Sequence, residues 1–545
     1  MIRRVLVLAF LMVAVSAGGA AGKDRWNSCE KLLMGSLGDQ THPISTKVPE
    51  AQRFYDKGMA LAFGFNHAES KRAFAKAAEL DPECAMCNWG IAYVLGPNIN
   101  APMDDAAVPE AYAAIQKALK LSAAATNKEK AKIQAMAKRY APEPVRDRSA
   151  LDKAYAEAMR DLRNKFPEDA DAAVFFAEAL IDLNPWNYWD ADGKPKNSIT
   201  EVVAALESVL KINPNHPHAN HLYIHAVEAS KDPDRAVPSA DRLGDLQPGA
   251  GHLVHMPAHI YIRTGQYHKA AVANERAIVA DDAYRETCTP KGIYPLAYMP
   301  HNHHFLWAAY TWEGRGDAAI KTARTLVERV DTAKMRLPGL GTLQHFWVTP
   351  MFVLARFERW DDILKESVPP EDLKYPNGVW HHVRGMAYVA QDRLDEAKAE
   401  LKKLEALAAD PDLENVKIWG KNKVSDLLNV GAHLLAGKIE EKQGNTNAAI
   451  KHYQAGIELE DSLYYEEPHT WYYPMRQPMG HAQLKSGQAG EAEKYFLEDL
   501  ERHRENGWSL YGLLLSARAM GDKNKIQNRE QRFQKAWAHA DFAFK

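Results

Sequence analysis

The chain has 545 residues, of which 46% are apolar and 26% charged, and its formal net charge is -3. It is too long for one compact core but ordinary in composition for a folded protein, so several domains or one extended stack of repeats is expected. Lys and Arg are not clustered in excess, which argues against a nucleic-acid surface.

The first predicted element, residues 1–22, is a signal peptide. Two arginines precede an apolar run from Val5 to Val15, and small residues follow it. The run is too short for a permanent membrane anchor, and no later segment is long and apolar enough to be a transmembrane anchor. The mature chain is therefore expected to begin near Lys23 and to be periplasmic or secreted.

The four cysteines, Cys29, Cys84, Cys87 and Cys288, are too few for a disulfide scaffold. In an oxidising compartment they can form one or two disulfides, whose pairing the sequence leaves open. Cys84 and Cys87 are also conceivable soft metal ligands. We favour a disulfide or another structural use for this pair, because a CxxC pair outside the cytoplasm is readily oxidised.

Residues 23–96 are expected to contain an N-terminal segment and the first helical repeats. One predicted helix ends at Phe63, residues 64–67 break it, and a second helix follows, giving one helical hairpin. Small residues are expected where the two helices cross. The residues that mark this unit are Gly58, Phe74, Ala77 and Pro82.

This pattern resembles the tetratricopeptide repeat family, whose period is near 34 residues. The frame recurs along most of the chain at Gly265, Ala270 and Ala277; Gly314 and Ala319; Gly385 and Ala397; Gly437, Gly444 and Ala449; and Gly480, Gly487 and Ala492. The resemblance implies an all-α fold, an α-solenoid of helix pairs with a concave inner groove. It implies an architecture and not an activity, although most members of the family bind partners.

Between residues 97 and 211 the frame is interrupted, and we expect a helical region with aromatic loops at the mouth of the groove. The clearest loops are 97–100 and 184–189. Trp186 and Trp189 in the second loop are candidates for a substrate wall. Aromatic residues beside proline are also common in ordinary loop packing.

Residues 212–366 are predicted to form histidine-rich central repeats, and 367–545 the C-terminal repeats. In the resembled family, three positions of each first helix point into the groove, and residues three and four apart do share one helix face. Eleven of the 22 histidines fall on such positions: His218, His221, His225, His252, His255, His259, His301, His304, His345, His382 and His481. Random placement would put about one there.

Three consecutive first helices carry the residues that predict a metal centre. The expected ligands are His221, His225 and Glu228; His252, His255 and His259; and His301 with His304. Their spacing puts each group on one helix face, as metal ligands commonly are, and stacked repeats should make the faces converge. A lone groove histidine is usually a wall residue, but clustered imidazoles without metal must stay neutral or repel one another.

The ligand types favour a transition metal without fixing it. Imidazole, with Met256 and Met299 nearby, favours copper, whereas Glu228 suits zinc or iron equally well. Arg263 is a candidate anchor for an anion. Three isolated histidines are further groove candidates: His345, His382 and His481.

Pro257 and Pro350 lie inside predicted first helices, where each removes a backbone hydrogen bond and should bend the helix. A tighter superhelical curve is the simpler consequence. A bend at Pro257 would also aim His255 and His259 inward.

The sequence therefore predicts an exported metalloprotein, with a histidine-ligated transition-metal centre in a solenoid groove. As an enzyme it would be a metal-dependent oxidoreductase or hydrolase. The sequence has no Gly-rich phosphate loop, GxSxG elbow or HExxH motif. The alternative is a metal-free scaffold that binds a peptide or protein in its groove, with the histidines as polar contacts.

Overall fold

The computed structural model describes residues 28–190 and 192–544, and the predicted signal peptide lies outside them. Within these residues the fold is helical, apart from one small antiparallel hairpin formed by β1 (Lys417–Ile418) and β2 (Asn422–Lys423). The prediction of an all-α solenoid is confirmed. No helix in the described part of the chain is long and apolar enough to cross a membrane.

A helical segment over residues 28–36 precedes the first half of the stack. The helices of that half are α2 (Pro49–Phe63), α3 (His67–Leu80), α4 (Ala85–Leu95), α5 (Val108–Leu121), α6 (Asn127–Ala137), α7 (Ser149–Lys165), α8 (Ala170–Asp182) and α9 (Ile199–Ile212). The middle contains α10 (Pro217–Val227), α11 (Val237–Leu246), α12 (Gly251–His255), α13 (Pro257–Arg263), α14 (Tyr267–Thr287), α15 (Met299–Trp312) and α16 (Gly316–Arg329).

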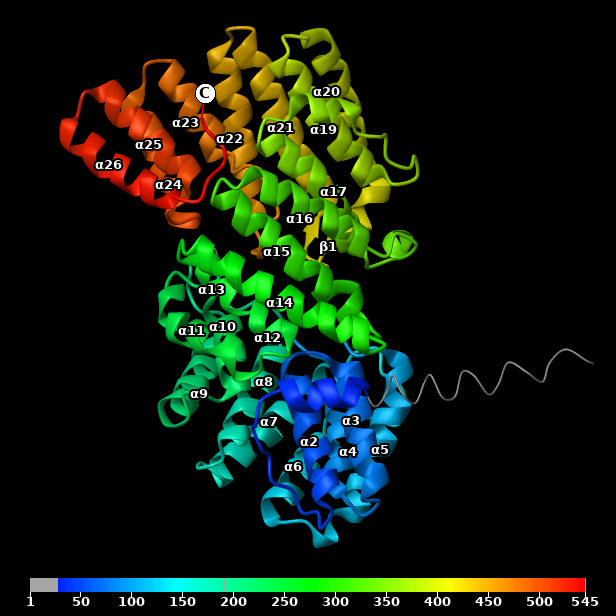
Figure 1. Ribbon diagram of the computed structural model, residues 1–545. Helices are drawn as coiled ribbons and strands as arrows, with labels where there is room; N and C mark the ends of the chain where they lie inside the picture. Colours follow the sequence, from blue (N-terminus) through cyan, green and yellow to red (C-terminus); the bar gives the residue numbers. More distant parts are fainter. Residues whose placement is uncertain (1–27, 191, 545) are drawn as a thin grey trace, which may run out of the picture.

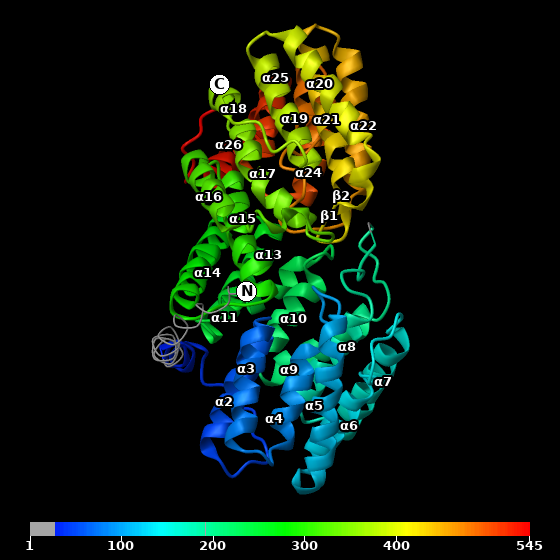
Figure 2. The same ribbon diagram turned by 90° about the vertical axis from the view of Figure 1, so that its right-hand side faces the viewer.

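The second half begins after a loop and continues to the end of the described chain. Its helices are α17 (Gly341–Arg356), α18 (Trp360–Lys365), α19 (Lys374–Ala390), α20 (Leu394–Ala408), α21 (Val424–Lys442), α22 (Thr446–Ser462), α23 (Arg476–Lys485), α24 (Ala489–Arg502), α25 (Gly507–Met520) and α26 (Lys523–Ala536). Figures 1 and 2 show the first half at the bottom, α10–α15 in the middle and the second half at the top. The histidine-rich region therefore joins the two halves.

The repeat frame has a packing cause that the first hairpin illustrates. The ring of Phe74 on α3 lies so close to Gly58 of α2 and Gly90 of α4 that a Cβ at either glycine would come within 2.6 or 2.4 Å of it. Phe496 of α24 lies in the same way between glycines of α23 and α25. One large ring between two small residues lets three consecutive helices approach closely, as helix packing requires.

Pro257 divides the predicted histidine-bearing helix in two, since α12 ends at His255 and α13 begins at Pro257. Proline lacks the backbone N–H of a helix interior, and its ring clashes with the preceding turn. His255 and His259 consequently lie on either side of the break. Pro350, by contrast, lies inside α17, which continues past it.

All four cysteines are paired. Cys84 and Cys87 form a disulfide at the start of α4, as we favoured over metal binding. Cys29 is bonded to Cys288, which follows α14, so the segment before α2 is tied to the histidine-rich middle of the stack.

Candidate metal centre

Six histidines from four helices of the middle region gather in two groups of three. The first triad is His221, His225 and His252, and the second triad is His255, His259 and His301. Within each triad, one ring nitrogen from each residue lies within 4.8 Å of the other two. All six residues are buried, between 0 and 7% exposed.

Local sequence explains how the ligands are brought together. His221 and His225 lie one turn apart on α10, so both rings project from one face. His301 lies in the first turn of α15, which follows directly on a π-helical turn, Tyr294–Tyr298. Such turns are frequent at functional sites in helices.

Glu228 connects the two triads. The Nδ1 atom of His225 donates to its Oε1 at 2.7 Å, and Nδ1 of His259 donates to its Oε2 at 2.6 Å. Burial alone would raise the pKa of Glu228, but the nearby His259 and the two hydrogen bonds hold it at about 2. It is therefore a carboxylate at neutral pH.

This position differs from our expectation that Glu228 is itself a ligand. Both of its oxygens already accept hydrogen bonds from the histidine rings, so it stands behind them. Carboxylates in this position commonly orient metal-binding histidines, fix the tautomer and increase the basicity of the free nitrogen.

The hydrogen bonds of the second triad determine its tautomers. Asn274 of α14 donates its Nδ2 to the Ala270 carbonyl at 2.8 Å, so its Oδ1, 2.7 Å from Nδ1 of His255, acts as the acceptor. Nδ1 of His255 therefore carries the proton, and so does Nδ1 of His259 against Glu228. In the neutral rings both Nε2 atoms carry lone pairs.

These two Nε2 atoms, on His255 and His259, lie 3.0 Å apart. Lone pairs at that distance repel one another. Two imidazole nitrogens bound to one tetrahedral metal ion, each about 2.0–2.1 Å from it, would be separated by about 3.3 Å. The geometry thus fits a shared cation closely.

The first triad is built on the same plan. Nδ1 of His221 donates to the carbonyl of Phe63 at 2.8 Å, which leaves Nε2 of His221 as an acceptor, 3.2 Å from Nε2 of His252. Within the described residues, Nε2 of His225 and Nδ1 of His252 are buried without hydrogen-bond partners. Such groups are rare in folded proteins, and a bound ion is one explanation.

Burial keeps these imidazoles neutral. It lowers the pKa of His221, His252, His255 and His301 well below the ordinary value of 6.5, and the neighbouring imidazoles lower it further. Burial also lowers the pKa of His225, although Glu228 opposes the shift. Neutral imidazole is the form that binds metal.

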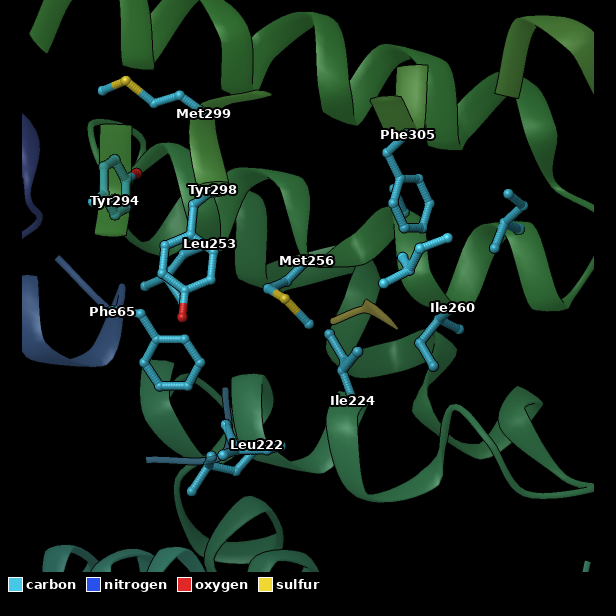
Figure 3. Packing of buried hydrophobic residues seen from close by; sticks show 14 of the residues in the cluster. Phe65, Leu222, Ile224, Leu253, Met256, Ile260, Tyr294, Tyr298, Met299 and Phe305 are labelled. Atoms are coloured by element: carbon cyan, nitrogen blue, oxygen red, sulfur yellow. The ribbon is translucent and has the colours of Figure 1, made fainter. Parts of the chain in front are cut away.

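One phenylalanine packs against each triad, and Figure 3 labels both of them, Phe65 and Phe305, among the buried apolar side chains of this region. The ring centroid of Phe65 lies 4.6 Å from that of His221 and 5.1 Å from that of His252. Phe305 lies 4.9 Å from His255 and 4.7 Å from His259. These apolar walls fix the rings and exclude water from behind them.

A cavity of about 690 Å³ reaches both triads. His225 and His252 of the first triad and His259 and His301 of the second line it, together with Glu228. Its remaining walls come from Tyr298 and from segments of both halves of the solenoid, within 97–103, 146–153, 182–186, 419–421 and 465–467. A metal ion at either triad would therefore be accessible to a molecule in the cavity.

The two tryptophans expected at the groove mouth have different surroundings. Trp186 lines the cavity with its ring edge-on to His225, at 5.1 Å between centroids, and its Nε1 donates to Asn100. Trp189 donates its Nε1 to the carbonyl of Ala226 at 2.8 Å. It anchors the loop to α10.

Arg263 does not fit the expected role of anion anchor. It donates to the carbonyls of Glu228 at 2.9 Å, Ser230 at 3.2 Å and Arg502 at 3.3 Å. Among the described residues it is not part of the cavity lining. Arg263 instead links the end of α10 to the C-terminal repeats.

The remaining predicted histidines are buried or half-buried but join neither triad. His304 lies 5.4 Å from His345, whose Nδ1 is 2.8 Å from the Tyr375 hydroxyl. His382 donates to the Gly431 carbonyl at 3.1 Å and accepts from the Tyr472 hydroxyl at 2.9 Å. His481 packs against Phe496.

Sequence reasoning missed several residues around the site. Asn274 lies on the second helix of its repeat, and the cavity residues Trp419, Tyr465 and Glu467 lie far along the chain, so no local pattern marks them. A third group of ligand-type residues, His268, Glu313 and His539, lies at the surface, where the side chain of His268 is 51% exposed.

No family model and no curated protein matches the chain. Solved structures with a similar fold include Ypp1, with a TM-score of 0.42, 9% identity, and coverage of 97% of this chain and 83% of that one. The Cut9–Hcn1 hetero-tetramer of the APC/C has a TM-score of 0.32 and 11% identity, with coverage of 95% of this chain and 81% of that one. Human IFIT1 bound to m7Gppp-AAAA has a TM-score of 0.32 and 12% identity, with coverage of 94% of each chain. These low scores carry no conclusion about function.

Proposed function

We propose that this chain is an exported metalloprotein whose two histidine triads bind two transition-metal ions, copper being favoured. The observation that carries the proposal is the pair of lone-pair nitrogens of His255 and His259, buried and 3.0 Å apart. A hydrogen-bonded wall residue turns its acceptor toward a donor. Here two acceptors face each other, an arrangement that a cation stabilises.

The ligand chemistry supports copper. All six candidate ligands are imidazoles, which suit copper, zinc, iron and nickel, and copper has the highest affinity in the divalent series. Glu228 was the residue that made zinc or iron equally attractive. Its place behind His225 and His259 weakens that argument, because its oxygens are engaged by the rings.

The arrangement also suits catalysis. Three protein ligands per ion leave one coordination position for a small molecule, as in catalytic rather than structural sites. The cavity gives access to that position. We therefore propose a metal-dependent enzyme, and favour an oxidoreductase over a hydrolase because copper is a redox metal.

Export is supported by the two disulfides, Cys29–Cys288 and Cys84–Cys87, because such bonds persist in oxidising compartments. It is also supported by the signal-like sequence of residues 1–22.

The alternative is a metal-free scaffold. A cavity of about 690 Å³ between loops of both halves is large enough for part of a peptide, and tetratricopeptide-like solenoids are suited to such partners. In that case the histidines are polar contacts, and their facing nitrogens require bridging water or protonation.

Elemental analysis of the purified protein, before and after reconstitution with copper, zinc and iron, distinguishes these functions. We expect close to two equivalents of one transition metal per chain, resistant to dialysis. Less than about a tenth of an equivalent after every reconstitution would overturn the proposal and favour the scaffold.

A further inference from the structure

The two triads lie against each other. The ring centroids of His225 and His259, one from each triad, are 5.6 Å apart, and those of His252 and His255 are 5.9 Å apart. Within the triads the same distances run from 4.9 to 6.4 Å. Histidines of different triads are therefore as close as histidines of one triad, and the six rings form a single cluster.

Helical register sets the spacing between the triads. His252 belongs to the first triad, and His255, on the next turn of α12, begins the second. His259 follows one turn further, beyond the break at Pro257. Because one turn of an α-helix advances the chain by about 5.4 Å, ions held in the two triads would lie about one turn apart. One small ligand with a donor atom at each end spans such a distance.

Both triads open toward the same space. Four of the six histidines line the cavity of about 690 Å³: His225, His252, His259 and His301. The other two are held from behind, since Nδ1 of His221 donates to the carbonyl of Phe63 at 2.8 Å and Nδ1 of His255 donates to Asn274 at 2.7 Å. The open coordination positions of both ions would therefore face one cavity, where a single ligand contacts both.

Charge favours an anion between the ions. Imidazole binds metal in its uncharged form, so two divalent ions would add positive charge that the ligands themselves do not offset. Both oxygens of Glu228 are engaged by His225 and His259, so this carboxylate does not bridge the ions itself. Glu467, another carboxylate of the lining, lies 4.0 Å from the guanidinium of Arg263. Neither group of three ligand-type residues includes a carboxylate, so the bridging anion must come from outside the protein.

We propose that the two triads, given the metal ions proposed above, form one dinuclear centre that binds a single small anion between its ions. The ligand class is an anionic group with two donor atoms, one for each ion. Two-metal sites of this kind act as a clamp on the atoms that they hold, which separate mononuclear sites do not. The cavity supplies the path by which such a ligand reaches the centre.

The test titrates azide, a linear anion with a donor atom at each end, into protein loaded with whichever metal it retains. Calorimetry gives the stoichiometry, and we expect one azide per two ions. His301→Ala should lose the ion of the second triad and bind azide at least about tenfold more weakly, since one cation remains to attract it. The matched control is His382→Ala, which removes a buried histidine outside both triads and should keep two ions and the azide affinity of the parent.

The copper-loaded protein offers a second readout, electron paramagnetic resonance. Two copper(II) ions joined by one anion couple their unpaired electrons, so the signal of the parent should largely disappear when azide binds. His301→Ala, with its single ion, should keep its full signal under the same conditions.

The outcomes separate this inference from the proposed function. Two azide ions per pair of metal ions, no azide binding by fully loaded protein, or an undiminished copper signal with azide bound overturns the dinuclear centre and leaves both metal sites standing. A single retained ion per chain likewise overturns the pairing. Less than about a tenth of an equivalent of metal after every reconstitution removes the metal sites and this inference with them.

Discussion

The triad histidines and the isolated histidines His345 and His382 differ in what their ring nitrogens face. Both kinds lie on first helices and are buried, and burial lowers the pKa of His345 and His382 to about 3. Yet His382 is satisfied by a carbonyl and a hydroxyl, whereas His255 faces the acceptor nitrogen of His259. Burial therefore does not define a metal site, but the convergence of unprotonated nitrogens does.

The difference arises from how many histidines adjacent repeats contribute. α10, α12, α13 and α15 each present histidines toward a neighbour that does the same. In α17, α19 and α23 a single groove histidine meets tyrosine, backbone or phenylalanine.

Removing one histidine of each kind tests this difference most strongly. His255→Ala should reduce metal affinity at the second triad by about 100-fold or more, because two imidazoles cannot complete the shell. His382→Ala should retain both ions, although it lowers the free energy of unfolding by about 2 kcal/mol through two lost hydrogen bonds. Competitive titration with a chelator measures the affinities.

The double variant His255→Ala/His301→Ala sharpens this result. Its loss of metal-binding free energy should be far smaller than the sum of the losses in the two single variants, since the second change acts on a site that the first has already disrupted. Additive, small losses of affinity would mean that the two histidines do not share one metal ion.

A second variant tests the shared carboxylate. Glu228→Gln should weaken metal binding about 10- to 100-fold at both triads, because His225 and His259 each lose the acceptor that orients them. Glu460→Gln is the control and should leave both affinities unchanged. Isothermal titration calorimetry measures both affinities. A loss of affinity confined to one triad would contradict the bridging role of Glu228.

Because of its isolated buried histidines, we expect the metal-free protein to lose free energy of unfolding as the pH falls. Their folded pKa lies below the unfolded value of 6.5, so the unfolded chain binds more protons as pH falls, and stability present above pH 6.5 is lost below it. Each such group contributes about 1.4 kcal/mol per pH unit. Urea unfolding at pH 7, 6 and 5 should show His382→Phe with a shallower loss than the parent. Equal slopes would contradict the burial argument.

The smallest effect is expected from the cysteines. Replacing Cys84 and Cys87 with serine should leave metal content within error of the parent, because the two sulfurs are bonded to each other. Elemental analysis that found a loss as large as that of His255→Ala would transfer the ligand role to this pair.

Helical spacing predicted much of the site and failed at recognisable points. His221 with His225, and His255 with His259, were found because one turn separates each pair. Spacing also put Glu228 on the face shared with His221 and His225. Spacing cannot distinguish a metal ligand from a residue that orients a ligand, because the second role of Glu228 depends on a hydrogen bond from His259 on another helix.

Other features depend on contacts that no local pattern encodes. His304 lies one turn from His301, yet the next repeat supplies only His345 opposite it, so His304 belongs to no group of three ligand-type residues in the described part of the chain. Trp419 and Glu467 come from loops of the second half and reach the cavity only through the superhelical path of the chain.

Anomalous diffraction from crystals of the copper-loaded protein, at the copper absorption edge, tests the central claim most directly. The account predicts two peaks, one among His221, His225 and His252 and one among His255, His259 and His301, each within about 2.0–2.1 Å of its imidazole nitrogens. No peak at either triad, or a peak only at the surface group of His268, Glu313 and His539, would contradict it.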